Sequence, residues 1–183
     1  MLIKMKASLA LEDGTVVTGN AFGEQGAQWG EVVFNTGMTG YQEILTDPSY
    51  CGQIVVMTYP LIGNYGINTE DFESKKSGIR GFVVYEECGR PSNWRSSSSI
   101  SDFLYREGII GLSGVDTRSL TLHLRNFGTM RGIISTENKT PEELIQEAGS
   151  CPFLSGLDLV TAVATREIYV IEGTGHRVVL FDL

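Results

Sequence analysis

Apolar positions along this chain follow two patterns, short runs typical of buried strands and longer segments of helical period. Ala7, Leu9 and Leu11 alternate with polar positions, and Asp13-Gly14 then separates them from a second strand-like run at 15–18. Asp-Gly between two such runs is a strong hairpin signal. The sequence therefore predicts a β-hairpin at the start of the chain.

Further strands are predicted where β-branched and other apolar residues cluster. The expected strands cover 31–34, 53–59, 79–85, 109–115 and 130–135, with two more extended segments at 159–169 and 176–182. In contrast, residues 19–30 contain four glycines and little periodicity. That stretch is predicted to be a connecting loop.

Three helices are predicted, and each has a recognisable start. They are expected at 100–107, 117–127 and 141–148. Ser99, Asp116 and Thr140 precede them as N-cap residues. Thr140 and Glu143 also form a capping box with a proline at the first helical position, which is typical of a strong helix start.

The second helix carries an apolar face, because Leu120, Leu124 and Phe127 recur at i, i+4 and i+7. Combined with the predicted strands, the three helices indicate an α/β or α+β domain of high strand content. We expect mixed or antiparallel strands to pack with the helices on one side.

The longest irregular stretch lies between the strands at 31–34 and 53–59. Gly37 or Gly40 is expected to take a positive φ and reverse the chain there. A single helical turn follows, and the proline of the sequence DPSY ends it. Ser49 is therefore predicted to lie in a tight bend, where folds often present functional side chains.

Three long segments carry a family resemblance. NTGMTGYQEILTDPSY at 35–50, TYPLIGNYGIN at 58–68 and VDTRSLTLHLR at 115–125 resemble the amino-terminal domain of the carbamoyl-phosphate synthase small subunit. The resemblance extends from about residue 6 to residue 183. Leu61 departs from it, because the family often has histidine there, and Cys51 replaces a residue that is usually small or polar.

The resemblance implies a three-layer ββα sandwich with mixed or antiparallel strands and three main helices. It assigns residues 1–172 to the amino-terminal domain of the small subunit. Residues 173–183 would be a linker and the first strand of a truncated class I glutamine amidotransferase domain. The apolar run at 177–182 fits the first buried strand of such an α/β unit.

The function implied by the resemblance is that of a ligase. The whole enzyme makes carbamoyl phosphate from glutamine, bicarbonate and ATP for pyrimidine and arginine biosynthesis. Its large subunit, the expected partner of this chain in a heterodimer, uses the ATP and Mg²⁺, so no cofactor or metal is expected here. Ser49 would bind L-glutamine in the pocket of the chain's own amidotransferase domain. The catalytic Cys-His-Glu triad would lie beyond residue 183, so this chain alone is expected to be inactive.

Composition narrows the classes of partner. The formal net charge is −8 and the isoelectric point is near 4.8, without a cluster of lysine or arginine. Sequence-independent binding to nucleic acid or to anionic lipid would need such a cluster. No apolar run approaches the roughly 20 residues of a membrane helix, and no signal peptide is apparent. We therefore expect a cytoplasmic protein that binds neither nucleic acid nor membrane.

Other residues suggest chemistry less strongly. Cys51, Cys88 and Cys151 lack the spacing of a zinc site or a disulfide framework, and Cys51 has no partner base in the sequence, so all three are expected to be reduced, packed thiols. Glu43 and Asp47 are four residues apart without a nearby histidine. We expect them to be structural rather than an acid–base pair, with Asp47 capping its own bend.

Two alternative functions remain open on the sequence. One is a free-standing module that binds a small molecule or a partner on the same fold. The other is a small hydrolase that combines Ser49 with His123 or His176. Two isolated histidines without ligand spacing do not favour a zinc site.

Overall fold

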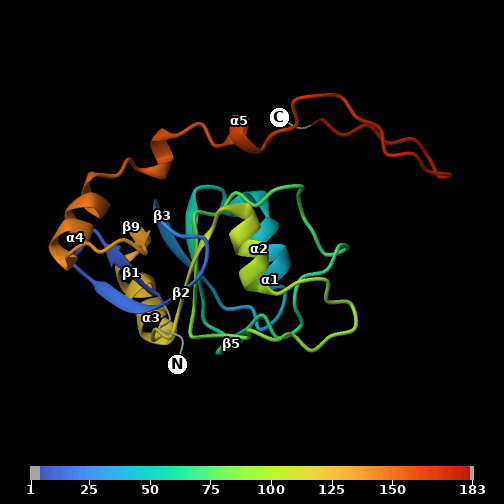
Figure 1. Ribbon diagram of the computed structural model, residues 1–183. Coiled ribbons are helices and arrows are strands. Elements are labelled where there is room, and N and C mark those ends of the chain that lie inside the picture. The colour runs from blue at the N-terminus through green and yellow to red at the C-terminus, as the bar shows by residue number, and fades with distance from the viewer. Residues whose placement is uncertain (1–4, 182–183) are drawn as a thin grey trace.

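A computed structural model describes residues 5–181, and its centre is a closed barrel of seven strands (Figure 1). The strands follow one another around the barrel in the order β1-β2-β8-β6-β4-β3-β9. Their bounds are β1 Lys6–Leu11, β2 Val16–Gly23, β3 Ala27–Asn35, β4 Gln53–Met57, β6 Gly81–Val84, β8 Ile110–Ser113 and β9 Met130–Ser135.

The barrel closes because β1 pairs with strands on both of its sides. Leu9 lies opposite Val17 of β2 in the predicted hairpin and opposite Ile134 of β9 on the other edge. The pairs β3-β4, β4-β6 and β6-β8 are parallel, whereas the remaining four are antiparallel. The expected three-layer ββα sandwich is therefore wrong. The apolar pattern predicted strands, but it carries no information on whether the two edges of the sheet meet.

The prediction of a connecting loop at 19–30 is also wrong, because most of this stretch is strand. Its glycines lie where the barrel backbone approaches closely. A Cβ on Gly19 would come within 2.1 Å of the Ser113 carbonyl oxygen, and one on Gly30 within 2.5 Å of the Gly52 carbonyl oxygen. Glycine in a strand often marks such an approach, and here it was mistaken for a loop signal.

Five α-helices and two short 3₁₀ turns connect the strands of the described chain. They are α1 Tyr41–Thr46, η1 Pro48–Tyr50, α2 Ile100–Glu107, α3 Thr117–Phe127, α4 Pro141–Ser150, η2 Leu154–Gly156 and α5 Val160–Val163. The predicted caps of α2, α3 and α4 are present, including the capping box of α4. A separate parallel pair of short strands, β5 Leu61–Ile62 and β7 Glu86–Glu87, flanks the barrel.

The sequence predicted that the helices pack together on one side of the strands, and this prediction is wrong. α3 contributes Leu120 and Leu124 to the apolar cluster inside the barrel, which also draws on β1, β3, β4, β6, β8 and β9. α1 and α2 build a second cluster over the outside of β4 and β6, and α4 packs on β1 and β9 (Figure 1). Phe127 is excluded from the predicted face of α3. It is 70% exposed and lies against His123 instead.

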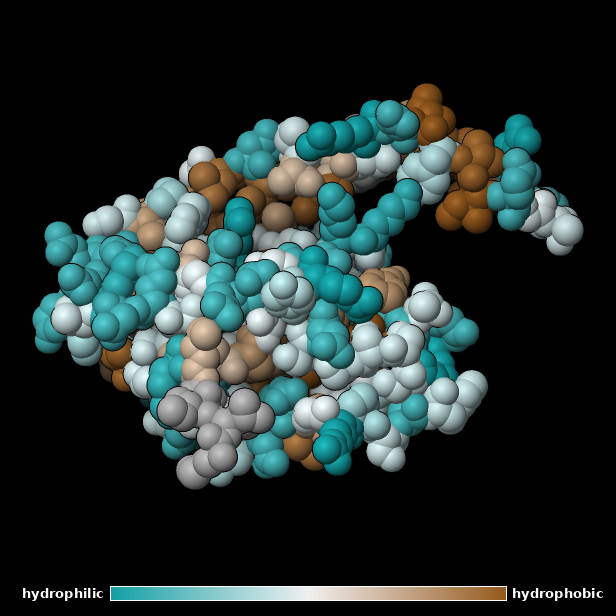
Figure 2. Space-filling model, in the orientation of Figure 1, coloured by the Kyte–Doolittle hydropathy of each residue, from teal (hydrophilic) through white to brown (hydrophobic). Residues whose placement is uncertain are grey.

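The end of the described chain is an exposed tail, residues 164–181. Beyond the short helix α5 these residues form no helix or strand, so the strands expected at 159–169 and 176–182 are absent within 5–181, and residue 182 lies outside the described residues. Apolar side chains nevertheless collect on this tail at the upper right of Figure 2. Ile168, Ile171 and Leu180 are each at least 85% exposed, so these side chains are not packed on the described part of the domain.

No helix within residues 5–181 has the length and apolarity needed to cross a membrane.

Candidate functional site

Ser49 lies at the surface on the 3₁₀ turn η1, between α1 and β4. Asp47 caps this turn: its Oδ1 accepts a hydrogen bond of 2.8 Å from the Ser49 backbone N–H. Pro48 occupies the first position of the turn, and α1 ends before it at Thr46, as predicted. None of the hydrogen bonds found in the described chain uses the Ser49 hydroxyl. The Asp47 carboxylate and Pro48 therefore order the turn, while the Ser49 hydroxyl has no hydrogen-bond partner in the described chain.

The start of α1 depends on a side chain from a distant loop. Gly40 takes φ 81°, as expected for one of the two glycines, and has no side chain with which to cap the helix. The Tyr65 hydroxyl accepts the Gly40 N–H at 2.7 Å and the Tyr41 N–H at 3.1 Å. The rings of Tyr65 and Tyr41 are stacked with centroids 4.1 Å apart. Tyr65 therefore supplies the cap that Gly40 lacks.

Glu43 would normally compete for that role. It occupies the third position of α1, from which a glutamate can accept the N-cap N–H in a capping box. Because the Tyr65 hydroxyl holds the Gly40 N–H, the Oε2 atom of Glu43 is buried without a hydrogen-bond partner among the described residues. Asp47 caps its own bend, as expected. The structure brings no histidine into a hydrogen bond with either carboxylate.

The first turn of α1 is held by Gln42, the second residue of the helix and a fully buried polar side chain. Its Nε2 donates to the Asn68 carbonyl oxygen at 2.7 Å, and its Oε1 accepts the Asn68 N–H at 2.9 Å. Both ends of the amide are therefore satisfied by the backbone of a single residue. A buried amide is tolerated when its donors and acceptors are paired in this way.

The end of α1 is held by the loop that follows Asn68. The Thr46 hydroxyl accepts the Glu73 N–H at 3.0 Å, and the Thr46 carbonyl oxygen accepts a hydrogen bond of 2.7 Å from the Ser74 hydroxyl. The Ser77 hydroxyl donates to the Leu45 carbonyl oxygen. The last carbonyl groups of this six-residue helix thus find partners outside the helix.

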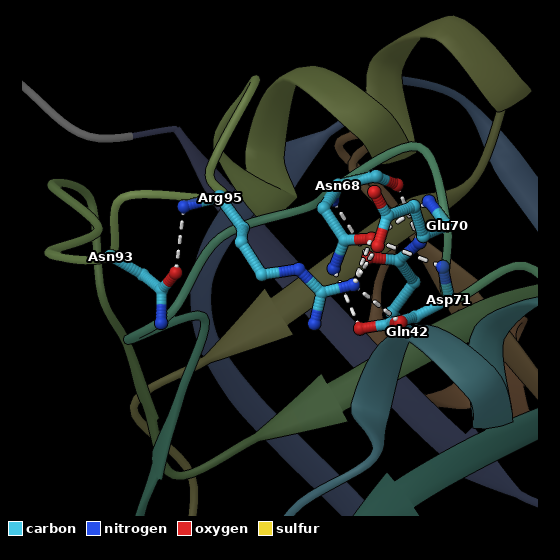
Figure 3. A network of polar contacts seen from close by, with 6 residues as sticks. All are labelled: Gln42, Asn68, Glu70, Asp71, Asn93 and Arg95. Atoms are coloured by element: carbon cyan, nitrogen blue, oxygen red, sulfur yellow. Dashed lines mark hydrogen bonds and ion pairs between the residues drawn. The ribbon is translucent and has the colours of Figure 1, made fainter.

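Asn68 is itself fixed by a polar network, shown in Figure 3. Its Oδ1 accepts the Glu70 and Asp71 backbone N–H groups, and its Nδ2 donates to Asp71 Oδ2 at 2.7 Å. Arg95 reaches in from another loop, with Nη2 at 2.8 Å from Glu70 Oε2 and 2.9 Å from Asp71 Oδ1. Hydrogen bonds from Asn68 and then from Arg95 lower the pKa of Asp71. The network keeps Asp71 charged and binds two loops together.

Burial raises the pKa of both tyrosines at the start of α1. The Tyr41 hydroxyl donates to the Gly66 carbonyl oxygen at 2.8 Å, so its proton is used within the fold. Neither tyrosine is poised to act as a base near neutral pH. Their role at this site is structural.

The two histidines lie in other settings. His123 Nε2 is 2.6 Å from Asp13 Oδ2, at the turn of the first hairpin, and His176 is exposed on the tail. Neither makes a hydrogen bond with Ser49, so the structure does not assemble the Ser–His pair considered for a hydrolase.

The three cysteines are free thiols. The Cys88 and Cys151 sulfurs lie near the carbonyl oxygens of Arg90 and Glu147, and burial raises the pKa of Cys151. A nucleophilic thiol needs the opposite shift. Within residues 5–181 no three potential metal ligands gather into a site.

Sequence reasoning missed the residues that hold this site together, namely Tyr65, Asn68 and Arg95. It used residues 58–68 only as one of the three motifs that carry the family resemblance. One signal was available. Gln42 precedes Leu45 by three positions and so shares the buried side of a short helix, where an amide requires partners. The sequence did not indicate which residues those partners were.

These features define a class of protein: a domain built on a mixed β-barrel, with an exposed serine on a turn that Asp47 and Pro48 order. One family profile, described as the CPSase domain of the carbamoyl-phosphate synthase small chain, matches residues 9–134. The chain belongs to this family. The resemblance drawn from its three motifs is thereby confirmed.

Curated relatives agree with this assignment. The carbamoyl phosphate synthase small chain of Syntrophotalea carbinolica is 57% identical over 165 residues, which are 90% of this chain and 44% of that protein. The small chain of Nitratidesulfovibrio vulgaris strain Miyazaki F is 55% identical over 170 residues, 93% of this chain and 45% of the relative.

A pyrimidine-specific small chain of Halalkalibacterium halodurans is 53% identical over 178 residues, 97% of this chain and 49% of the relative. The chain therefore spans about half the length of these curated relatives.

Proposed function

We propose that this chain is the amino-terminal part of the glutamine-hydrolysing small subunit of carbamoyl-phosphate synthase. In the full enzyme it binds the large subunit and contributes Ser49 to glutamine binding. The glutamine itself sits in an amidotransferase domain of the same small chain, which supplies the cysteine nucleophile. The large subunit binds and uses ATP and Mg²⁺ to make carbamoyl phosphate for pyrimidine or arginine biosynthesis.

The observation that supports this proposal is the state of the Ser49 hydroxyl. It is exposed on a turn that Asp47 and Pro48 order, and none of its own hydrogen-bonding capacity is used within the described chain. A hydroxyl can donate one hydrogen bond and accept two, which suits the carboxylate or ammonium group of an amino acid. Because the turn is already ordered, the hydroxyl loses little entropy on binding.

Ser49→Ala in the full-length small chain, assembled with its large chain, tests the proposal. Loss of the hydroxyl is expected to cost about 0.5–3 kcal/mol of glutamine binding, depending on the charge of the group it contacts. That corresponds to glutamine use weakened by about 2- to 150-fold. Synthesis from added ammonia bypasses glutamine hydrolysis and is expected to be unchanged.

Ser155→Ala is the matched control. Ser155 is also an exposed serine on a three-residue 3₁₀ turn, η2, and its hydroxyl makes no hydrogen bond found in the described chain. It is expected to leave both activities unchanged. Equal losses with glutamine and ammonia after Ser49→Ala, or no loss with either, would remove Ser49 from the glutamine site.

A further inference from the structure

We infer that Gln42 is the positioning residue for the Ser49 turn, acting through its paired hydrogen bonds to the backbone of Asn68. This inference rests on the proposed contact between Ser49 and glutamine. Gln42 does not reach the surface, so it acts on the substrate only through the placement of Ser49.

The segment that needs positioning is short. α1 has six residues, and an isolated helix of that length is not stable in water. It continues through Asp47 directly into the turn that carries Ser49, and Asp47 binds the Ser49 N–H. A tilt or shift of α1 therefore moves the Ser49 hydroxyl. Displacements of about 1 Å are enough to impair a reaction that depends on substrate placement.

The Gln42 contact is suited to prevent such a shift. Its two hydrogen bonds, at 2.7 and 2.9 Å, run in opposite senses to one residue and fix both the height and the rotation of the helix. Because Gln42 is 0% exposed, water does not compete for either bond. Tyr65 holds the start of α1 and Gln42 holds its first turn, whereas the end of the helix is held by hydrogen bonds at Thr46.

The partner of Gln42 is rigid as well. Asn68 is 7% exposed, and its side chain accepts the Glu70 and Asp71 N–H groups. Arg95 adds ion pairs from a second loop (Figure 3). Gln42 therefore attaches α1 to two loops that are joined to each other.

Gln42→Met tests the inference in the full-length small chain assembled with its large chain. Methionine keeps the approximate length and flexibility of glutamine but makes neither hydrogen bond. The KM for glutamine is expected to rise roughly tenfold, as for the loss of one to two net hydrogen bonds. The kcat with ammonia is expected to stay within about twofold of the wild type.

Gln53→Met is the matched control. Gln53 begins β4, three residues after the end of the Ser49 turn, and its Nε2 donates to Glu31 Oε2 at 3.2 Å. The same substitution there removes an amide without touching α1, and the KM for glutamine is expected to be unchanged. If Gln42→Met fails to fold, Arg95→Met takes its place, because Arg95 is partly exposed and its loss loosens the loop that holds Asn68 without burying an unpaired group. A smaller rise in KM with normal use of ammonia would then support the inference.

Ser49→Ala, measured in parallel, separates this inference from the proposed function. If Ser49→Ala raises the KM for glutamine and Gln42→Met does not, the positioning role of Gln42 is overturned while the function of Ser49 stands. If Ser49→Ala has no effect, the proposed glutamine contact fails first, and with it the inference. Loss of ammonia-dependent activity in Gln42→Met to the same extent as glutamine use would reduce Gln42 to a general structural residue.

Discussion

Residues 41–50 and the tail at 164–181 differ in a way that their composition does not suggest. The first segment is short and rich in polar residues, yet Gln42 and Leu45 are both 0% exposed. The tail contains several large apolar residues, yet Leu180 is 88% exposed. Polar composition did not prevent burial in the first segment, and apolar composition did not produce it in the second.

The difference lies in the partners that each segment meets. The 41–50 segment faces loops that supply a hydroxyl cap, backbone groups for an amide and hydrogen bonds for its last carbonyl groups. The tail meets few such groups. One contact is that of Lys75 with the Tyr169 ring, whose centroid is 5.7 Å from the ammonium nitrogen. Order therefore depends on complementary groups being fixed nearby, because ordering each residue costs about 1–2 kcal/mol of backbone entropy.

The largest difference in stability is expected when the same leucine-to-alanine substitution is made in each of the two regions. Leu45→Ala empties a fully buried site in the cluster over β4 and β6 and is expected to lower the free energy of unfolding by about 2–5 kcal/mol. Leu180→Ala removes an exposed side chain and is expected to change it by less than about 0.5 kcal/mol. Urea denaturation of the two variants measures both values. Similar losses would show that the tail packs on the domain in solution.

A smaller effect is expected from glycine substitutions. Gly40→Ala places a Cβ at φ 81° and is expected to cost about 1–2 kcal/mol, although there is room for the methyl group beside Glu43. Gly173→Ala, in the tail, meets nothing within 4 Å and does not have a positive φ, so it is expected to be neutral. Thermal denaturation compares the two. A neutral Gly40→Ala would contradict the left-handed start of α1.

The smallest effect is expected in the acid range. Hydrogen bonds from Asn68 and Arg95 lower the folded-state pKa of Asp71 below 3.8, so its contribution to stability is complete above that value and is lost as the pH falls through the folded pKa. Asp71→Asn is expected to flatten the decline in stability below pH 3.8. Denaturant titrations between about pH 2 and about pH 5 measure the slope. Glu172→Gln, which also removes one negative charge but from the exposed tail, is the control for the change in net charge.

Local physical chemistry allowed a good part of this protein to be predicted. The Asp13-Gly14 hairpin, the capping box at Thr140 and the bend at Ser49 each depend on a few neighbouring residues. The family motifs were read correctly for the same reason, since they are continuous in sequence. The position of Ser49 on a capped surface turn therefore follows from the amino-acid sequence alone.

Other features arise from contacts between residues far apart in the chain. Closure of the barrel depends on the pairing of β1 with β9. Gly19 and Gly30 lie where other parts of the chain come too close for a side chain. Phe127 is exposed, although helical period alone assigned it to the buried face of α3. Gln42 and Asn68 are 26 positions apart, and each supplies the hydrogen bonds that the other needs. Hydrophobic period indicates which side of an element is buried, but not which element covers it. Only the tertiary structure decided how the turn that carries Ser49 is held in place.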